Sequence, residues 1–212
     1  MVKSWVITGV CLIGAGVLCC TAAIGAGALN QQRYREKLHL TDQTDAPSEN
    51  FTAIQVALED ADLTVQAGDS VSVEAENISA DCYDVTVRDG VLRIEQRSND
   101  LNQYTLIHLG GFSTPTAKIT LTLPEENYKS MDISASYGDC TVDGISAQTF
   151  SANLDCGDGT FQNISTENYT AKSSYGDLQL SDSEVKDSLS VEADSGSVTF
   201  ARIDIRNRCQ VQ

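Results

Sequence analysis

The fold is decided by residues 137–203, in which one short pattern is written repeatedly. Four corner motifs align with one another: Tyr137-Gly138-Asp139, Cys156-Gly157-Asp158, Tyr175-Gly176-Asp177 and Ser195-Gly196-Ser197. Their glycines are 19, 19 and 20 residues apart along the chain. A fixed period near twenty residues is typical of stacked structural repeats.

Apolar residues recur at matching offsets in each copy, and most of them are spaced two apart. The first copy holds Cys140, Val142, Ile145, Phe150, Ala152 and Leu154, and the third holds Leu178, Leu180, Val185, Leu189, Val191 and Ala193. A spacing of two is the period of a strand with one buried face. Two short strands per copy bury little alone, so we expect each copy to stack on the next, about 4.8 Å away.

The fold class predicted from these repeats is all-β: a single-stranded β-solenoid of coils about 19–20 residues long, with glycine at the corners because it adopts positive φ without steric cost. An antiparallel sandwich of short strands is the alternative. A sandwich requires regular strands and turns, but it does not require matching residues at a constant period. The repeats therefore favour the solenoid.

The 212 residues divide into four predicted parts. Residues 1–37 form an N-terminal transmembrane anchor with a basic flank, and 38–50 form a polar linker. Residues 51–205 form the solenoid, and 206–212 form a polar tail. This length accommodates one anchor and one domain with a substantial core.

Residues before the repeats carry weaker signals. The segments 61–65 and 70–75 resemble a shortened copy of the repeat and predict an early, degenerate coil. Residues 85–94 predict a β-hairpin, because Asp89-Gly90 permits a tight primed turn. Residues 99–116 have little periodicity and predict a long excursion from the core.

The apolar segment at residues 5–29 contains no charged residue and is long enough to cross the hydrocarbon layer of a membrane as a helix. A cleaved signal peptide is the alternative, since Ala26-Gly27-Ala28 fits the small-x-small cleavage pattern. Arg33, Arg35 and Lys37 come after the segment, and the positive-inside rule weakly places the later domain in the cytoplasm. Against this, a first apolar segment so near the start usually exports the rest of the chain, so we expect a single-pass membrane protein with an extracytoplasmic domain.

The charge is concentrated after the apolar segment. Residues 38–212 contain 29 acidic and 10 basic residues, whereas the whole chain has a net charge of −16. Such an acidic domain repels nucleic acid and anionic lipid, so no nucleic-acid partner is expected. Cations or basic partners suit its surface better.

Asp139, Asp158 and Asp177 come directly after three of the corner glycines and form a candidate cation column. In stacked coils these carboxylates would lie about 4.8 Å apart and repel one another by about 1 kcal/mol per pair in water. Calcium, which takes oxygen ligands, would relieve that repulsion. The alternative is that each carboxylate accepts a hydrogen bond from the backbone of its turn, in which case no cofactor is required.

Tyr137 and Tyr175 form a second column, with Cys156 between them in the repeat register. Exposed aromatic side chains can bind sugars or peptides, and they can also simply cover the corner. They are therefore a candidate binding surface.

Other chemistry has little support in the sequence. Zinc-site, nucleotide-binding and hydrolase motifs with the required spacing are absent, and the only histidines are His39 and His108. No catalytic residue is expected, and the chain is predicted not to be an enzyme. A Cys82–Cys209 disulfide stays open, because sequence does not give connectivity.

The corner motifs, together with the apolar N-terminal segment and the linker, resemble the putative-adhesin, β-strand-repeat family of unknown function found in Firmicutes. The motifs that carry this resemblance are Tyr137-Gly138-Asp139, Tyr175-Gly176-Asp177 and Asp194-Ser195-Gly196-Ser197-Val198. That family is similar in layout to a membrane protein of antibiotic-responsive envelope-stress operons. The resemblance implies a right-handed solenoid outside the membrane and brings no catalytic residues.

Three hypotheses for function fit these features. The first is an extracytoplasmic binding or scaffolding module that contacts an unidentified envelope component or membrane partner. The second is a cytoplasmic scaffold that polymerises through its solenoid ends, as bactofilins do. The third is a polysaccharide-cleaving enzyme, because several such enzymes are β-helices with acidic grooves.

Overall fold

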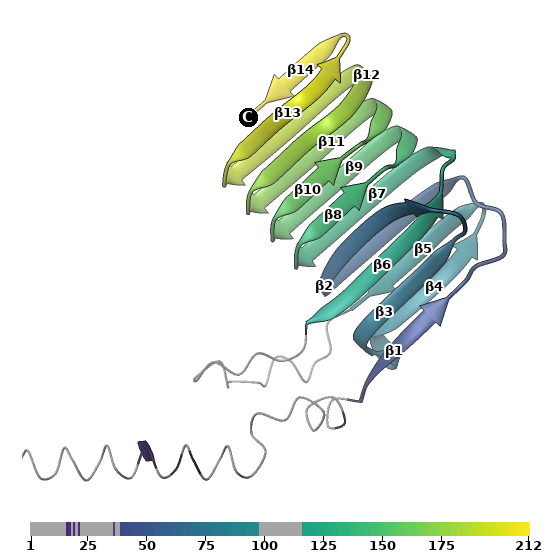
Figure 1. The fold of residues 1–212 in the computed structure, drawn as a ribbon, viewed down its shortest axis with the longest axis vertical. Helices are drawn as coiled ribbons and strands as arrows, with labels where there is room; N and C mark the ends of the chain where they lie inside the picture. The colour runs from purple at the N-terminus through teal and green to yellow at the C-terminus, as the bar shows by residue number, and fades with distance from the viewer. Residues whose placement is uncertain (1–15, 18, 20, 22–35, 37–38, 98–115) are drawn as a thin grey trace, which may run out of the picture.

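The computed structural model describes residues 16–17, 19, 21, 36, 39–97 and 116–212. Residues 39–97 and 116–212 form an all-β domain with a single 3₁₀ turn, and its strands belong to one hydrogen-bonded sheet that folds round on itself as a stack (Figure 1). The strands are β1 Leu40–Asp45, β2 Ala53–Gly68, β3 Ser72–Ser79, β4 Tyr83–Arg88, β5 Val91–Gln96, β6 Ala117–Pro124, β7 Asn127–Tyr137, β8 Cys140–Asp143, β9 Ser146–Cys156, β10 Gly159–Gln162, β11 Ser165–Tyr175, β12 Leu178–Ser195, β13 Val198–Ile205 and β14 Arg208–Val211.

The repeats form successive coils of the stack. β7 with β8, then β9 with β10, then β11 with the start of β12 each make one coil, and strands of neighbouring coils pair in parallel. The register places Tyr137 beside Cys156 and Cys156 beside Tyr175. The predicted stack of coils is confirmed, and the antiparallel sandwich is wrong because these strands pair in parallel.

The last glycine spacing is 20 rather than 19 because β12 contains one extra residue. Its register with β11 shifts between Thr166 and Asn168, whose partners are Val185 and Ser188. This bulge leaves the inward positions aligned, since Tyr169 still pairs with Leu189. The core pattern therefore continues into the next coil.

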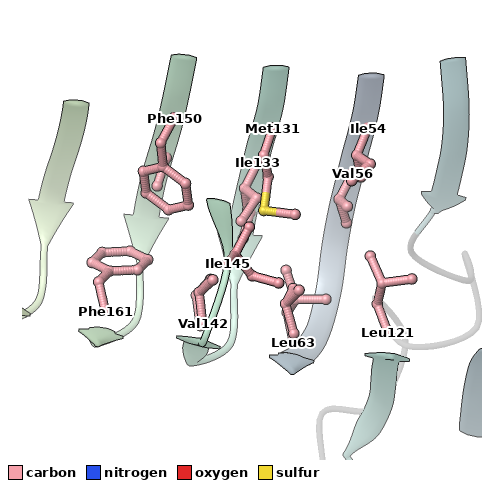
Figure 2. Close-up of a cluster of buried hydrophobic side chains, with 14 of the residues drawn as sticks. Ile54, Val56, Leu63, Leu121, Met131, Ile133, Val142, Ile145, Phe150 and Phe161 are labelled. Atoms are coloured by element: carbon pink, nitrogen blue, oxygen red, sulfur yellow. The ribbon is translucent and has the colours of Figure 1, made fainter. Parts of the chain in front are cut away.

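The stacked strands form two rows, one with β7, β9 and β11 and the other with β8, β10 and the start of β12. The core lies between these rows. Figure 2 shows Phe150, Met131 and Ile54 from one row facing Phe161, Val142 and Leu63 from the other. The rings of Phe150 and Phe161 meet edge to face with centroids 5.5 Å apart, and Tyr169 lies 4.9 Å from Phe150. Like residues from successive coils thus build one continuous core.

The N-terminal part of the stack does not follow chain order. The first half of β2 pairs in parallel with both β5 and β7, so that Ile54 lies between Leu92 and Met131. Its second half pairs with both β6 and β8, so that Leu63 lies between Ile119 and Cys140. β2 is therefore a coil inserted between segments that come later in the sequence.

Antiparallel strands cover the N-terminal end of the stack. β3 pairs with β6, β1 pairs with β3, and β4 pairs with β5. The predicted hairpin is confirmed: Asp89 and Gly90 form its turn with φ of 54° and 74°. The predicted coil over residues 61–75 is wrong. Residues 53–68 form the coil, and residues 72–79 turn back, because alternation with a period of two is the same for parallel and antiparallel strands.

Two predicted boundaries also change. The polar linker at 38–50 contains strand β1, whose largely exposed residues carry no hydrophobic alternation. The polar tail at 206–212 contains β14, which pairs with β12 and begins a further coil. Both strands are held by backbone pairing with a neighbouring strand, β3 for β1 and β12 for β14, rather than by side-chain burial.

Two predictions fall on residues outside the described part of the chain. The segment 5–29 is described only at residues 16–17, 19 and 21, and the excursion at 99–116 only at Thr116. Among the described residues there is no helix with the length and apolar character required to span a membrane. Membrane anchoring by residues 5–29 stays a prediction.

Candidate binding surface

The glycine column is required by contacts between coils as well as by backbone conformation. Gly157 and Gly176 have φ of 143° and 145°. A Cβ at Gly157 would lie 2.0 Å from the carbonyl oxygen of Gly138, and one at Gly176 would lie 2.1 Å from that of Gly157. Any larger residue would push neighbouring coils apart at this corner.

The aspartate column is a ladder of hydrogen bonds between coils. Oδ1 of Asp139 accepts from the backbone N–H of Asp158 at 2.9 Å, and Oδ1 of Asp158 accepts from that of Asp177 at 2.8 Å. The ladder starts at Asp62, which accepts from Asp139, and ends at Ser197, which donates to Asp177. The sequence analysis offered, as the alternative to a cation site, that each carboxylate accepts a hydrogen bond from the backbone of its own turn. The donor is indeed a backbone N–H, but it belongs to the next coil.

The cation hypothesis for Asp139, Asp158 and Asp177 has no geometric support of its own. The described residues contain no group of three or more His, Cys, Asp or Glu side chains that could hold a metal ion. One oxygen of each carboxylate is already bound to a backbone N–H. Calcium binding at this column stays a prediction.

The tyrosine column lies on the outside of the same corner. The side chains of Tyr137 and Tyr175 are 59% and 63% exposed, and Cys156 lies between them in register. Asp60 and Ser195 hold the equivalent positions in the neighbouring coils. The coils therefore present two aromatic rings two rungs apart on one ridge.

Exposed carboxylates surround the two rings, and we call this ridge the acidic corner: Tyr137 and Tyr175 with Asp139, Asp155, Asp158, Asp177 and Asp194. None of these carboxylates forms an ion pair with a described residue. The corner therefore combines uncompensated negative charge with aromatic surface.

A hollow of about 260 Å³ lies against Ser134 and Ser136 of β7, the latter next to Tyr137 in sequence. Residues 57–59 of β2 and residues 95–97 at the end of the hairpin form the rest of its lining. The buried Gln96 is held in place there, because its Oε1 accepts the backbone N–H groups of Glu59 and Asp60 at 3.1 and 2.9 Å.

Sequence reasoning missed a second corner column. Gly144, Asn163 and Asp182 have φ of 75°, 54° and 52°, and Arg202 continues the column at 55°. The signal was present, since Gly, Asn and Asp at a spacing of 19 are the residues that tolerate this conformation. Side chains link successive coils here: Asn163 Nδ2 donates to Asp143 at 2.7 Å, and Arg202 Nη2 donates to Asp182 at 2.6 Å. This column is structural.

The cysteines that the structure describes are all free. Cys82 and Cys209 are both free and belong to opposite ends of the stack, so the disulfide left open between them does not form within this chain. Burial raises the pKa of the Cys140 thiol to about 12, so it packs as a small apolar residue. Of the two histidines, His39 precedes β1, and His108 lies outside the described residues.

Comparison with known proteins identifies the domain. A family model described as Toastrack DUF4097 matches residues 51–207, which include the whole stack from β2 to β13. The chain belongs to this family. The resemblance to putative adhesins drawn from the corner motifs is thereby confirmed. None of the curated proteins matches the Toastrack chain.

The Toastrack domain can be compared with solved structures of putative adhesins. A putative cell adhesion protein from Clostridium sporogenes is 10% identical, with a TM-score of 0.51 over 81% of this chain and 99% of its own. A putative adhesin from Bacteroides fragilis is also 10% identical, with a TM-score of 0.36 over 82% of this chain and 97% of its own. At this identity the first likeness shows a common fold alone.

Proposed function

We propose that this Toastrack protein is a non-enzymatic binding module at the bacterial cell envelope, anchored by residues 5–29 with its domain outside the membrane. The uncharged apolar segment near the start of the chain supports the anchor. The naming of a structural neighbour as a putative cell adhesion protein is consistent with an outward-facing domain. The acidic corner carries the binding part of the proposal.

The chemistry of the acidic corner suits a basic segment of a partner protein. Tyr137 and Tyr175 are two coils apart, about 10 Å, on a rigid ridge. Arginine side chains stack on tyrosine rings and pair with carboxylates, and the corner offers both groups side by side. An extended basic segment running along the stack would meet the two rings two coils apart, with one or two carboxylates in each coil from Asp139 to Asp177.

Binding can be tested with a labelled oligoarginine peptide and the full chain in detergent micelles, with an oligoglutamate peptide as the control ligand. Replacing both rings, Tyr137→Ser with Tyr175→Ser, is expected to weaken oligoarginine binding about tenfold, from roughly 0.5–1 kcal/mol per cation–π contact. Asp155→Asn should also weaken it. Asp132→Asn, a charge-matched change on the flat face of β7, should not. Equal effects of Asp155→Asn and Asp132→Asn would show that only net charge matters.

Location is tested by protease shaving of intact cells that carry a tag after Gln212, with a lysed control. Loss of the tag on intact cells is the expected result. A cytoplasmic scaffold is the second candidate, favoured by Arg33, Arg35 and Lys37 after the apolar segment. Survival of the tag until lysis would support that candidate and contradict the first. No observation on the described residues favours a polysaccharide-cleaving enzyme.

A further inference from the structure

The two ends of the stack differ. At the N-terminal end, antiparallel strands β1, β3 and β4 cover the coils (Figure 1). At the other end the last coil consists of β13 and β14, which pair with β12 on one side only. Their other backbone edges have no partner strand in the described chain. Unpaired edges of this kind are templates for pairing with another chain.

Apolar side chains that are buried elsewhere are uncovered at this open end. Phe200 occupies the position of Leu180 one coil earlier, and Val211 that of Val191. Leu180 and Val191 are each 1% exposed, whereas Phe200 and Val211 are 39% and 47% exposed. Cys209 occupies the position of the buried Leu189 and is also exposed. The core of the solenoid thus opens to solvent here.

Apolar residues on the last coil require an apolar partner, and the N-terminal end matches only part of them. Its outermost strands are β1, which ends the row that contains β13 and is largely exposed and polar, and β4, which ends the row that contains β14 and carries the partly buried Val85 and Val87. Two copies stacked end to tail would therefore leave Phe200 of β13 against the polar strand β1. The same open end on a second copy offers the same uncovered core.

The charges of the open end are self-complementary. Arg202 and Arg206 already pair with Asp182 and Glu184 of the preceding coil. Asp204 and Arg208 remain, and neither forms an ion pair with a described residue. A surface with one free charge of each sign can satisfy both charges against a two-fold-related copy of itself.

We propose that the open end, formed by residues 198–211, docks against the same end of a second copy in a closed two-fold dimer. Edges of β13 and β14 pair antiparallel across the interface, and Phe200 and Val211 become buried. The covered N-terminal ends then face outward, so assembly stops at two copies. This inference goes beyond the proposed function and gives each assembly two acidic corners, which would raise its avidity for a multivalent partner.

The reactivity of Cys209 reports on this interface. The full chain in detergent micelles is prepared with serine in place of Cys11, Cys19, Cys20, Cys82 and Cys156. The buried Cys140 is kept. Dimerisation should slow the reaction of Cys209 with maleimide about tenfold or more at high protein concentration, and dilution should restore it by mass action.

Two variants and two controls make the test specific. Phe200→Asp and, separately, Val211→Asp should make Cys209 react rapidly at every concentration, with circular dichroism showing that the stack is intact. Tyr175→Asp changes a more exposed aromatic residue on the side of the stack and should leave the protection unchanged. Thr41→Cys on a Cys209→Ser background places the thiol on β1, where reactivity should not depend on concentration.

Three results would overturn the dimer. Rapid reaction of Cys209 at all concentrations would mean that the end is free. Protection that persists on dilution would mean that one chain covers its own end. Concentration-dependent protection of the cysteine at Thr41 as well would mean that copies join end to tail. None of these readouts depends on oligoarginine binding, so failure of the dimer is distinguishable from failure of the binding module.

Discussion

The regular coils from β7 to β12 and the strands before residue 125 use the same alternating apolar residues but assemble differently. In the first region each coil follows the previous one. A glycine lies at each corner because the carbonyl oxygen of the corner residue in the preceding coil leaves no room for a side chain. In the second region β2 passes the same corner with Ala61, at the position of Gly138, and the chain then leaves the stack. Both regions share the alternation, and they differ because the chain turns back after residue 68 instead of starting another coil.

The largest expected effect is a loss of unfolding free energy, which should be greater for a core substitution in the regular coils than for one in the N-terminal strands. Phe150→Ala removes a fully buried ring from the aromatic cluster at the centre of the regular coils, and it should lower the free energy of unfolding by about 3–5 kcal/mol. Val85→Ala in the hairpin, where the side chain is only partly buried, should cost about 1 kcal/mol. Chemical denaturation of both variants measures the difference, and equal losses would contradict the placement of the core.

The next effect tests the corner itself. Gly157→Ala would place a Cβ 2.0 Å from a carbonyl oxygen in a strained conformation, and it should destabilise the fold by about 2–3 kcal/mol. Gly90→Ala is the matched control: its φ is also positive, but no atom lies within 4 Å of the added Cβ. That change should cost about 1 kcal/mol. Similar decreases in melting temperature for both variants would mean that backbone conformation, rather than the close approach of the neighbouring coil, is the reason for glycine at position 157.

A smaller effect is expected from the aspartate ladder. Asp158→Ala removes the acceptor for the backbone N–H of Asp177 and should cost about 1 kcal/mol, since a typical intramolecular hydrogen bond contributes that much. Asp132→Ala, on the flat face of β7, should change the midpoint of urea denaturation very little. A calcium-dependent rise in the midpoint for the unmodified protein, absent in Asp158→Ala, would instead favour the cation column.

The smallest effect is expected at a buried hydroxyl. The Tyr169 side chain is 1% exposed, and its Oη has no hydrogen-bond partner among the described residues. Burial raises its pKa well above the ordinary value for tyrosine. Tyr169→Phe keeps the ring against Phe150 and removes the unsatisfied group, so stability should stay the same or rise by about 1 kcal/mol. A loss of stability measured by calorimetry would indicate a hydrogen bond to the hydroxyl that the structure does not show.

The regular coils could be predicted from the sequence because the same residue types recur at the same offsets. Tyr137, Cys156 and Tyr175 aligned by spacing alone, and the structure places them side by side. The position of β2 could not be predicted, because its partners are up to 77 residues away and parallel pairing leaves no local signal. Strand β1 was missed because an exposed polar strand held by backbone pairing resembles a linker.

The candidate site was predicted in part. Its tyrosines and aspartates were found from the repeat, but the role of the aspartates depends on a donor in the next coil, which only the three-dimensional register reveals. The hollow against Ser136 was missed because its walls come from β2, β5 and β7, which are far apart in the sequence. Strand β14 at the open end was missed because residues 206–212 have too few apolar residues to predict a strand.

The central claim is that β2 lies inside the stack, against coils that come later in the chain. Disulfide trapping tests it directly with Asp60→Cys and Tyr137→Cys combined on a Cys156→Ser background, since these residues are partners in neighbouring strands. Adjacent strands bring such positions about 4.8 Å apart, within the range that a disulfide spans. Rapid, quantitative closure between residues 60 and 137 under mild oxidation is the predicted result. In the control, Tyr137→Cys alone should form a disulfide with the native Cys156. If that disulfide forms but none forms between residues 60 and 137, the inserted position of β2 is contradicted and only the arrangement of the regular coils is supported.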